Sequence, residues 1–207
     1  MEAHARGRMI PLWLALPLAS GAGLLLDAGF PDRGMWPLPF IGVGLLLVAL
    51  IGRSAGGALL VGFVAGATFY LALIQWASLF LGPLPMGALV ALQAALFALG
   101  CLLISLAYRW LPTSGANSHA RYLVPSAIAG LWVLREMVAS TWPYGGFSWG
   151  RLAMSQSESP FSDLLSWVGL SGVSFLMVAL VALVVEMLSP FSPARWGDAV
   201  VPALLTA

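Results

Sequence analysis

The chain has 207 residues, of which 60% are hydrophobic and only 8% are charged, and its mean hydropathy is +0.95. Soluble domains carry roughly 25% charged residues, so this composition excludes a soluble globular protein and indicates an integral membrane protein. The net charge of +1 gives no basic face for nucleic acid, and the single cysteine, Cys101, excludes an internal disulfide or a cysteine metal cluster.

Six apolar segments follow one another along the chain, and a spanning helix needs about 20 such residues. The second segment is short, so we expect it to be tilted little or to be extended by its flanks, and the third is long, so we expect it to be tilted or to extend beyond the bilayer. A seventh begins near Ala199 and reaches Ala207. We therefore expect residues 1–207 to form an all-α, polytopic transmembrane helix bundle with six complete spans plus the start of a seventh. The six are Met9–Leu26, Pro37–Gly52, Ala55–Leu81, Met86–Tyr108, Tyr122–Val138 and Leu164–Leu188.

The arginines predict an orientation, because cytoplasmic loops carry an excess of basic residues. With a cytoplasmic N-terminus, six arginines lie at inner ends and two lie in outer loops. The loop 139–163 is then extracytoplasmic. The alternative, a signal peptide in the first segment, explains these charges less well than a retained helix. The inner arginines are Arg6, Arg8, Arg53, Arg109, Arg121 and Arg195, and the outer ones are Arg33 and Arg151.

Small residues in the third segment predict close helix packing. Gly62 and Gly66 form a GxxxG pattern, which lets two helix backbones approach. Glycine is frequent in this chain, with 23 residues, so the pattern favours packing within the chain over dimerisation.

An adjacent charge pair, Arg135 and Glu136, ends the fifth segment and has two interpretations. Ionisable residues buried in a membrane are costly and are usually paired or functional. The alternative is an interfacial pair whose side chains extend to water. In either case Glu136 faces the outer loop, with Trp132 and Ser140 as its neighbours on the same helical face.

The segment from Trp142 to Gln156 is polar, aromatic and glycine-rich between two apolar blocks. Irregular backbone at a bilayer edge is costly unless it lies in water, packs on protein or lines a cavity. Aromatic rings with an arginine at head-group level suit a phospholipid, whereas the alternative is an ordinary interfacial loop. The residues expected to face lipid are Glu136, Phe147, Trp149, Arg151, Gln156 and, from the third segment, Trp76.

The same segment contains Gly146-Phe-Ser-Trp-Gly150, which matches the serine-hydrolase elbow G-x-S-x-G. That elbow needs a preceding strand, a histidine and an acid. No strand pattern precedes it, and His4 and His119 are expected on the opposite side from Ser148. The match is therefore interpreted as coincidental.

In order, these motifs resemble the membrane region of the bacterial apolipoprotein N-acyltransferases, and the resemblance covers nearly the whole chain. The last three motifs are fairly specific, and the first two are weak alone. The matching segments are Gly29–Pro37, Gly62–Gly66 with Gln75 and Trp76, Trp132–Glu136, Gly146–Gln156 and Gly169–Phe175. Departures from the family pattern are Ser148, where the family usually has proline, and Ala139 and Ser140, where an arginine often follows the glutamate.

The resemblance implies an enzyme of the bacterial inner membrane that moves an acyl chain from a phospholipid donor to the N-terminal cysteine amine of a diacylated lipoprotein. The family does this with a nitrilase-like domain that carries a Glu–Lys–Cys triad outside the membrane. Residues 1–207 contain no lysine, and Cys101 lies mid-membrane. We therefore expect no catalytic residue, metal or cofactor in this chain, and no transfer by it alone. The seventh span would deliver the missing domain to the outer face.

Two other function classes stay open. Some relatives of the family are fused to, or partner with, a polyprenol-phosphate mannosyltransferase, so the chain is alternatively a non-catalytic anchor of such an enzyme. A small-solute transporter would show paired broken helices and ionisable groups at the midplane, and the sequence offers neither clearly.

Overall fold

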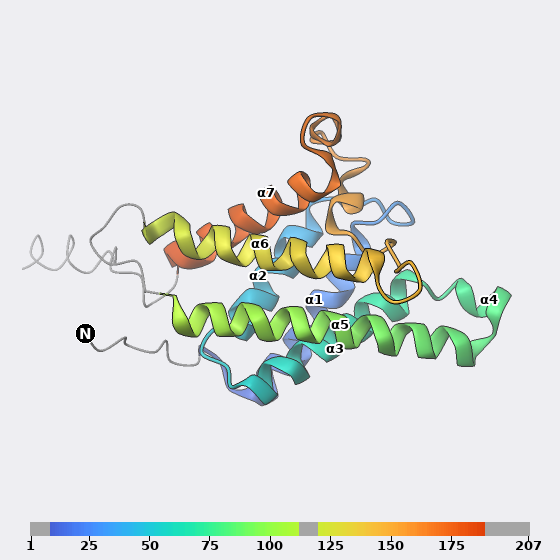
Figure 1. The fold of residues 1–207 in the computed structure, drawn as a ribbon, viewed down its shortest axis with the longest axis horizontal. Helices are drawn as coiled ribbons and strands as arrows, with labels where there is room; N and C mark the ends of the chain where they lie inside the picture. The colour runs from blue at the N-terminus through green and yellow to red at the C-terminus, as the bar shows by residue number, and fades with distance from the viewer. Residues whose placement is uncertain (1–8, 112–119, 189–207) are drawn as a thin grey trace, which may run out of the picture.

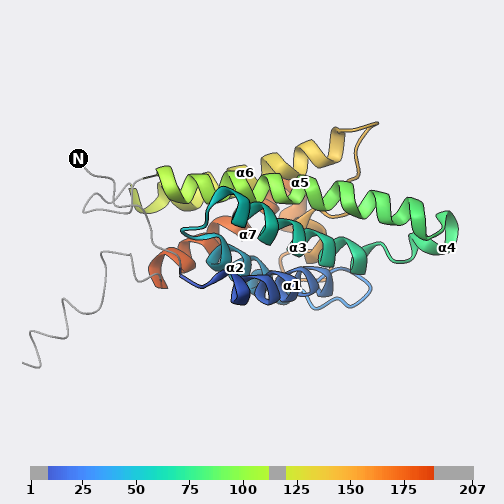
Figure 2. The same ribbon diagram turned by 90° about the horizontal axis from the view of Figure 1, so that it is seen from below.

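The structure is a computed structural model that describes residues 9–111 and 120–188. Within these ranges it is helical and contains no strand, which confirms the expected all-α bundle (Figures 1 and 2). The elements are α1 (Leu12–Ala28), α2 (Leu38–Leu50), α3 (Ala55–Leu73), α4 (Ala77–Leu81), α5 (Pro83–Trp110), α6 (Ala120–Thr141), the 3-10 helix η1 (Leu152–Gln156) and α7 (Leu164–Leu188).

The number of full-length spans differs from the expectation of six. Four helices are long and apolar enough to cross a membrane, namely α3, α5, α7 and the part of α6 from Tyr122 to Thr141. The other two, α1 and α2, have 17 and 13 residues, which is about 26 and 20 Å at 1.5 Å per residue. Both fall short of a hydrocarbon core of about 30 Å. The expected seventh span lies outside the described residues.

The third expected helix, Ala55–Leu81, is wrong as a single helix. It breaks after Leu73, because the chain turns at Ile74 (φ −115°, ψ 19°) before the short α4. The Ser78 hydroxyl donates a hydrogen bond to the Gln75 carbonyl at 2.8 Å, and such a local bond competes with helical pairing. The next helix, α5, begins earlier than expected, at Pro83, and has 28 residues.

Helices α3 and α5 pack at glycines, as the GxxxG pattern predicted. A Cβ atom on Gly62 would lie 2.6 Å from the Cβ of Cys101 and 2.8 Å from the Cα of Ala98. A Cβ on Gly66 would meet the Cβ of Phe97 at 2.8 Å. These distances leave no room for a side chain, so the prediction of packing within the chain is confirmed.

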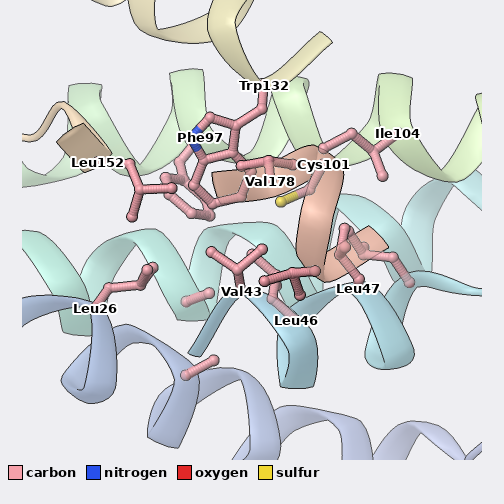
Figure 3. Packing of buried hydrophobic residues seen from close by; sticks show 14 of the residues in the cluster. Leu26, Val43, Leu46, Leu47, Phe97, Cys101, Ile104, Trp132, Leu152 and Val178 are labelled. Atoms are coloured by element: carbon pink, nitrogen blue, oxygen red, sulfur yellow. The ribbon is translucent and has the colours of Figure 1, made fainter. Parts of the chain in front are cut away.

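The buried core joins residues from all the long helices, and Figure 3 shows part of it. Phe97 and Trp132 lie edge to face with ring centroids 5.6 Å apart, and Cys101 is buried beside them. Leu152 of η1 is also a core residue, although it belongs to a loop. The loop that follows α6 is therefore packed onto the bundle.

Helix α7 is bent near its start. Gly169 has φ 67° and ψ 178°, which breaks the helical geometry between the turn that begins at Leu164 and the long part of the helix. A positive φ is strained for a residue with a side chain and not for glycine. In Figure 1 the segment before the bend turns away from the rest of α7.

Candidate functional site

Three segments that are distant in sequence meet at one end of the bundle: the α1–α2 loop, the region of α4, and the loop 142–163 (Figures 1 and 2). Direct contacts join them. The side chain of Gln156 donates to the carbonyl of Trp36 at 3.0 Å, and the rings of Trp76 and Trp149 lie 5.6 Å apart. The expectation that the α1–α2 loop and the loop after α6 share one side of the bundle is confirmed.

Glu136, on the last turns of α6, is the polar centre of this end. Its side chain is 1% exposed. Its Oε1 accepts hydrogen bonds from the indole N–H of Trp132 at 2.9 Å and from the backbone N–H of Leu152 at 2.8 Å. A buried carboxylate needs such donors, because burial of an unpaired charge is very costly. Glu136 thus fastens the loop 142–163 to α6.

Arg135 lies beside the same carboxylate and forms an ion pair with it. Its Nη2 lies 3.6 Å from the Oε1 of Glu136, and its side chain is also buried. The guanidinium lies 4.6 Å from the ring centroid of Phe97 and 4.9 Å from that of Trp132, which is cation–π geometry. Gly100 leaves room for it, since a Cβ there would lie 2.6 Å from the Cγ of Arg135. Of the two interpretations of the pair, the buried one is correct.

The loop returns to α6 immediately after leaving it. Gly146 has φ +78°, and a Cβ atom on it would overlap the backbone of Ser140. The next residue, Phe147, donates its backbone N–H to the carbonyl of Ala139 at 2.7 Å. Further on, a Cβ on Gly150 would lie 2.5 Å from the hydroxyl of Tyr70 on α3. Glycine at these two positions lets the loop lie flat against α6 and α3.

Arg151 and η1 connect the loop to α7. The guanidinium of Arg151 donates to the hydroxyl of Ser171, and its Nε lies 3.9 Å from the Oε2 of Glu136. That separation is an ion pair and too long for a hydrogen bond. The backbone N–H of Ala153 donates to the hydroxyl of Ser174 at 3.1 Å. The side chain of Arg151 is 18% exposed, so it is the partly accessible cation of the cluster.

The residues proposed from sequence differ widely in exposure. Glu136 and Gln156 are each 1% exposed and lie inside the protein. Trp149 and Trp76 are 54% and 43% exposed, and their rings pack together at the surface. Phe147 is half-buried against the core. Ser148 of the elbow-like motif is exposed, and both histidines lie outside the described residues.

This arrangement can hold a polar loop rigidly at the end of an apolar bundle and present aromatic rings beside a fixed arginine. No group of three or more histidine, cysteine, aspartate or glutamate residues that could hold a metal ion occurs in the ranges 9–111 and 120–188.

Comparison with known proteins identifies the family. The model of the apolipoprotein N-acyltransferase N-terminal domain matches residues 22–183. The chain belongs to the apolipoprotein N-acyltransferase family. Similar proteins include the apolipoprotein N-acyltransferases of Azotobacter vinelandii, 30% identical over 86% of this chain, and of Shewanella oneidensis, 29% identical over 87% of it. That of Vibrio parahaemolyticus is 23% identical over 93% of the chain.

The length of these relatives matters for the site. The aligned part is 35% of the first two N-acyltransferases and 38% of the third. The chain therefore spans about a third of the length of the curated relatives it matches. The site described above belongs to the membrane region of this family.

Several residues that hold the site in this N-acyltransferase-family chain were not assigned a role from sequence. They are the two α7 serines, Ser171 and Ser174, together with the ring of Tyr70 and the backbone carbonyl of Trp36. Both serines lie in the family-like segment Gly169–Phe175, and they are three residues apart, so they share one face of an apolar helix. A backbone carbonyl gives no sequence signal.

Proposed function

We propose that residues 1–207 form the membrane domain of an apolipoprotein N-acyltransferase, an enzyme that transfers an acyl chain from a phospholipid to the N-terminal cysteine of diacylated lipoproteins. In this proposal the chain anchors the enzyme in the bacterial inner membrane and presents the phospholipid donor. The nitrilase-like catalytic domain is supplied by sequence outside these residues. The N-terminus is cytoplasmic and the loop 139–163 is extracytoplasmic.

One observation carries the proposal: a buried ionic cluster fixes an aromatic, glycine-rich loop at one end of an apolar bundle. The backbone N–H of Leu152 and the guanidinium of Arg151 join the loop to Glu136. Trp132 and Arg135 hold the Glu136 carboxylate within the bundle. Such preorganisation is typical of sites that must hold a substrate in one orientation. An ordinary connecting loop would not require a buried carboxylate between two guanidinium groups.

We assign different roles to the candidate residues according to their burial. Trp149, Trp76 and the half-buried Phe147 supply the surface for lipid or for the catalytic domain. Arg151 contributes a partly exposed guanidinium, which suits a lipid phosphate. Glu136 positions the loop without touching substrate, and the Nε2 of Gln156 ties the loop to the carbonyl of Trp36. Residues 1–207 contribute no catalytic residue, metal or cofactor.

The test is acyl transfer in proteoliposomes that contain an acyl-labelled phospholipid and a synthetic diacylated lipopeptide with a free N-terminal cysteine. We expect transfer by the full-length protein and none by residues 1–207. A folded full-length protein that transfers nothing would overturn the proposal and favour the alternative, an anchor for a polyprenol-phosphate mannosyltransferase.

The same assay tests the loop surface. Trp149→Ala should lower the rate at limiting phospholipid several-fold, because an exposed aromatic contact to the donor is lost. Trp110→Ala is the matched control, since Trp110 is 72% exposed at the opposite end of α5. Equal rates for the two variants would remove Trp149 from the lipid-facing surface.

A further inference from the structure

An apolar groove of about 480 Å³ lies between α2 and α7. The two helices come together where a Cβ on Gly44 would lie 3.5 Å from the Cγ1 of Val181. Towards the loop end they diverge, and the groove lies between them. Its main lining residues are Trp36, Phe40, Phe161, Leu176, Met177 and Leu180.

Trp36 and Phe161 bracket one part of this groove, with their rings edge to face and centroids 5.7 Å apart. Leu176 and Leu180 are 48% and 55% exposed, so the wall that α7 contributes is open at the protein surface. Because α7 is apolar enough to cross a membrane, this opening faces the hydrocarbon of the bilayer.

Among the described residues that line the groove, Gln156 is the one strongly polar side chain, and half of its amide lacks a partner. Its Nε2 donates to the carbonyl of Trp36 at 3.0 Å and to the hydroxyl of Ser155 at 3.1 Å. A carbonyl can only accept, so the Trp36 contact fixes which end of the amide is nitrogen. The Oε1 is therefore left as a buried acceptor without a hydrogen bond.

A buried acceptor without a partner is costly, and a ligand with a suitable donor removes that cost. Water fits poorly, because a buried water needs two to four polar partners and the other lining residues are almost all apolar. A volume of 300–1,000 Å³ with apolar walls and few polar groups is typical of small-molecule sites.

We propose that this groove binds one acyl chain of a bilayer lipid whose head group carries an N–H or O–H donor. The chain lies along Leu176 and Leu180, and the donor bonds to the Oε1 of Gln156. This deepens the proposed function, on which it rests for its lipid ligand, and it adds a defined lipid position between α2 and α7.

The test is photolabelling of the full-length protein in phosphatidylcholine nanodiscs that contain a trace of phospholipid with a diazirine on one acyl chain. Probes with ethanolamine or glycerol head groups have the required donor, whereas a choline probe has none. We expect preferential labelling of the α7 peptide around Leu176, several-fold stronger with the donor-bearing probes.

Variants make the result specific. Leu176→Trp should fill the groove and lower this labelling several-fold. Leu103→Trp should leave it unchanged, because Leu103 is 41% exposed on α5 and lies outside the groove. Gln156→Leu should retain the labelling but abolish the difference between ethanolamine and choline probes.

Uniform labelling of every exposed helix face, or equal loss in the two tryptophan variants, would overturn the inference. So would an absence of labelling because later residues of the chain fill the groove. Acyl transfer, measured separately, reports on the proposed function: intact labelling without transfer would overturn that function and leave the groove assigned to lipid.

Discussion

The two sides of the bundle pack differently. On one side α3 and α5 touch at Gly62 and Gly66, where even a methyl group does not fit. On the other side α2 and α7 meet near Gly44 and then diverge around a groove of about 480 Å³. Interhelical attraction in a membrane comes from close packing and hydrogen bonds, because lipid tails are as apolar as the side chains. The first side therefore stabilises the fold, and the second leaves a space that lipid can fill.

The polar contacts at the end of the bundle that carries the loop 142–163 also differ between the close-packed side and the groove side. On the close-packed side, Glu136 lies between two arginines and accepts two hydrogen bonds. On the groove side, Gln156 has an acceptor without a partner. The Oε2 of Glu136 and the Nε of Arg151 also lack a hydrogen-bond partner, but these two atoms face each other as an ion pair, whereas the Oε1 of Gln156 belongs to a residue that lines an apolar groove.

The largest expected effect comes from removing the centre of the ionic cluster. Glu136→Ala deletes the acceptor of two buried N–H groups and leaves Arg135 without its counter-ion. Breaking a buried pair in this way costs about 3–5 kcal/mol. The free energy of unfolding, measured by equilibrium unfolding in mixed detergent micelles, should fall by that amount.

Two variants control this measurement. Glu136→Gln keeps an oxygen acceptor but loses the charge, so its loss should be intermediate. Glu158→Ala removes an exposed carboxylate of the same loop and should change stability by less than about 0.5 kcal/mol. If Glu136→Ala were as stable as Glu158→Ala, the loop would not depend on this cluster.

The next largest effect concerns the close contact between α3 and α5. Gly62→Ala places a methyl group 2.6 Å from the Cβ of Cys101 and 2.8 Å from backbone, which forces the helices apart. Such overpacking costs about 1–3 kcal/mol, measurable by the same unfolding equilibrium.

Gly56→Ala is the matched control for that change, because it lies in the same helix and a Cβ there would meet nothing within 4 Å. It should gain up to about 1 kcal/mol from helix propensity. Equal effects of the two substitutions would mean that α3 and α5 are not in tight contact.

Much of the fold could be predicted from the sequence, because hydropathy strongly indicates membrane-spanning helices. The bounds of the last helix, Leu164–Leu188, were predicted as observed. The break after Leu73 was missed, since the residues on both sides of Gln75 are equally apolar and hydropathy does not register a turn within an apolar run. The bend at Gly169 was missed for the same reason.

The sequence predicted which residues make up the site but not which of them are buried. The sequence placed Glu136 beside Trp132 and facing the loop that follows its helix, and both contacts occur in the structure. It could not decide whether Arg135 was buried, because that depends on space left by Gly100 of another helix. The groove depends on how α2 and α7 diverge, and neither helix has a sequence pattern that predicts this divergence.

A smaller effect is expected where η1 joins α7. Ser174 is fully buried, and Ser174→Ala removes the acceptor of the Ala153 N–H. The loss should be about 1 kcal/mol, and hydrogen exchange at Ala153 should become faster. Ser126→Ala, at an exposed position of α6, should alter neither quantity; unchanged exchange at Ala153 in the Ser174 variant would contradict the contact.

The smallest expected effect is on the groove side. Leu176→Ala should change the free energy of unfolding by less than about 0.5 kcal/mol, because this side chain is 48% exposed and loses few protein contacts. The same substitution at Leu46, which is 0% exposed, should cost about 2–5 kcal/mol through cavity formation. Equal losses of stability for the two variants in the full-length protein would mean that protein and not lipid covers Leu176. The groove would then be open only in residues 1–207, and the two sides of the bundle would not differ in the full-length protein.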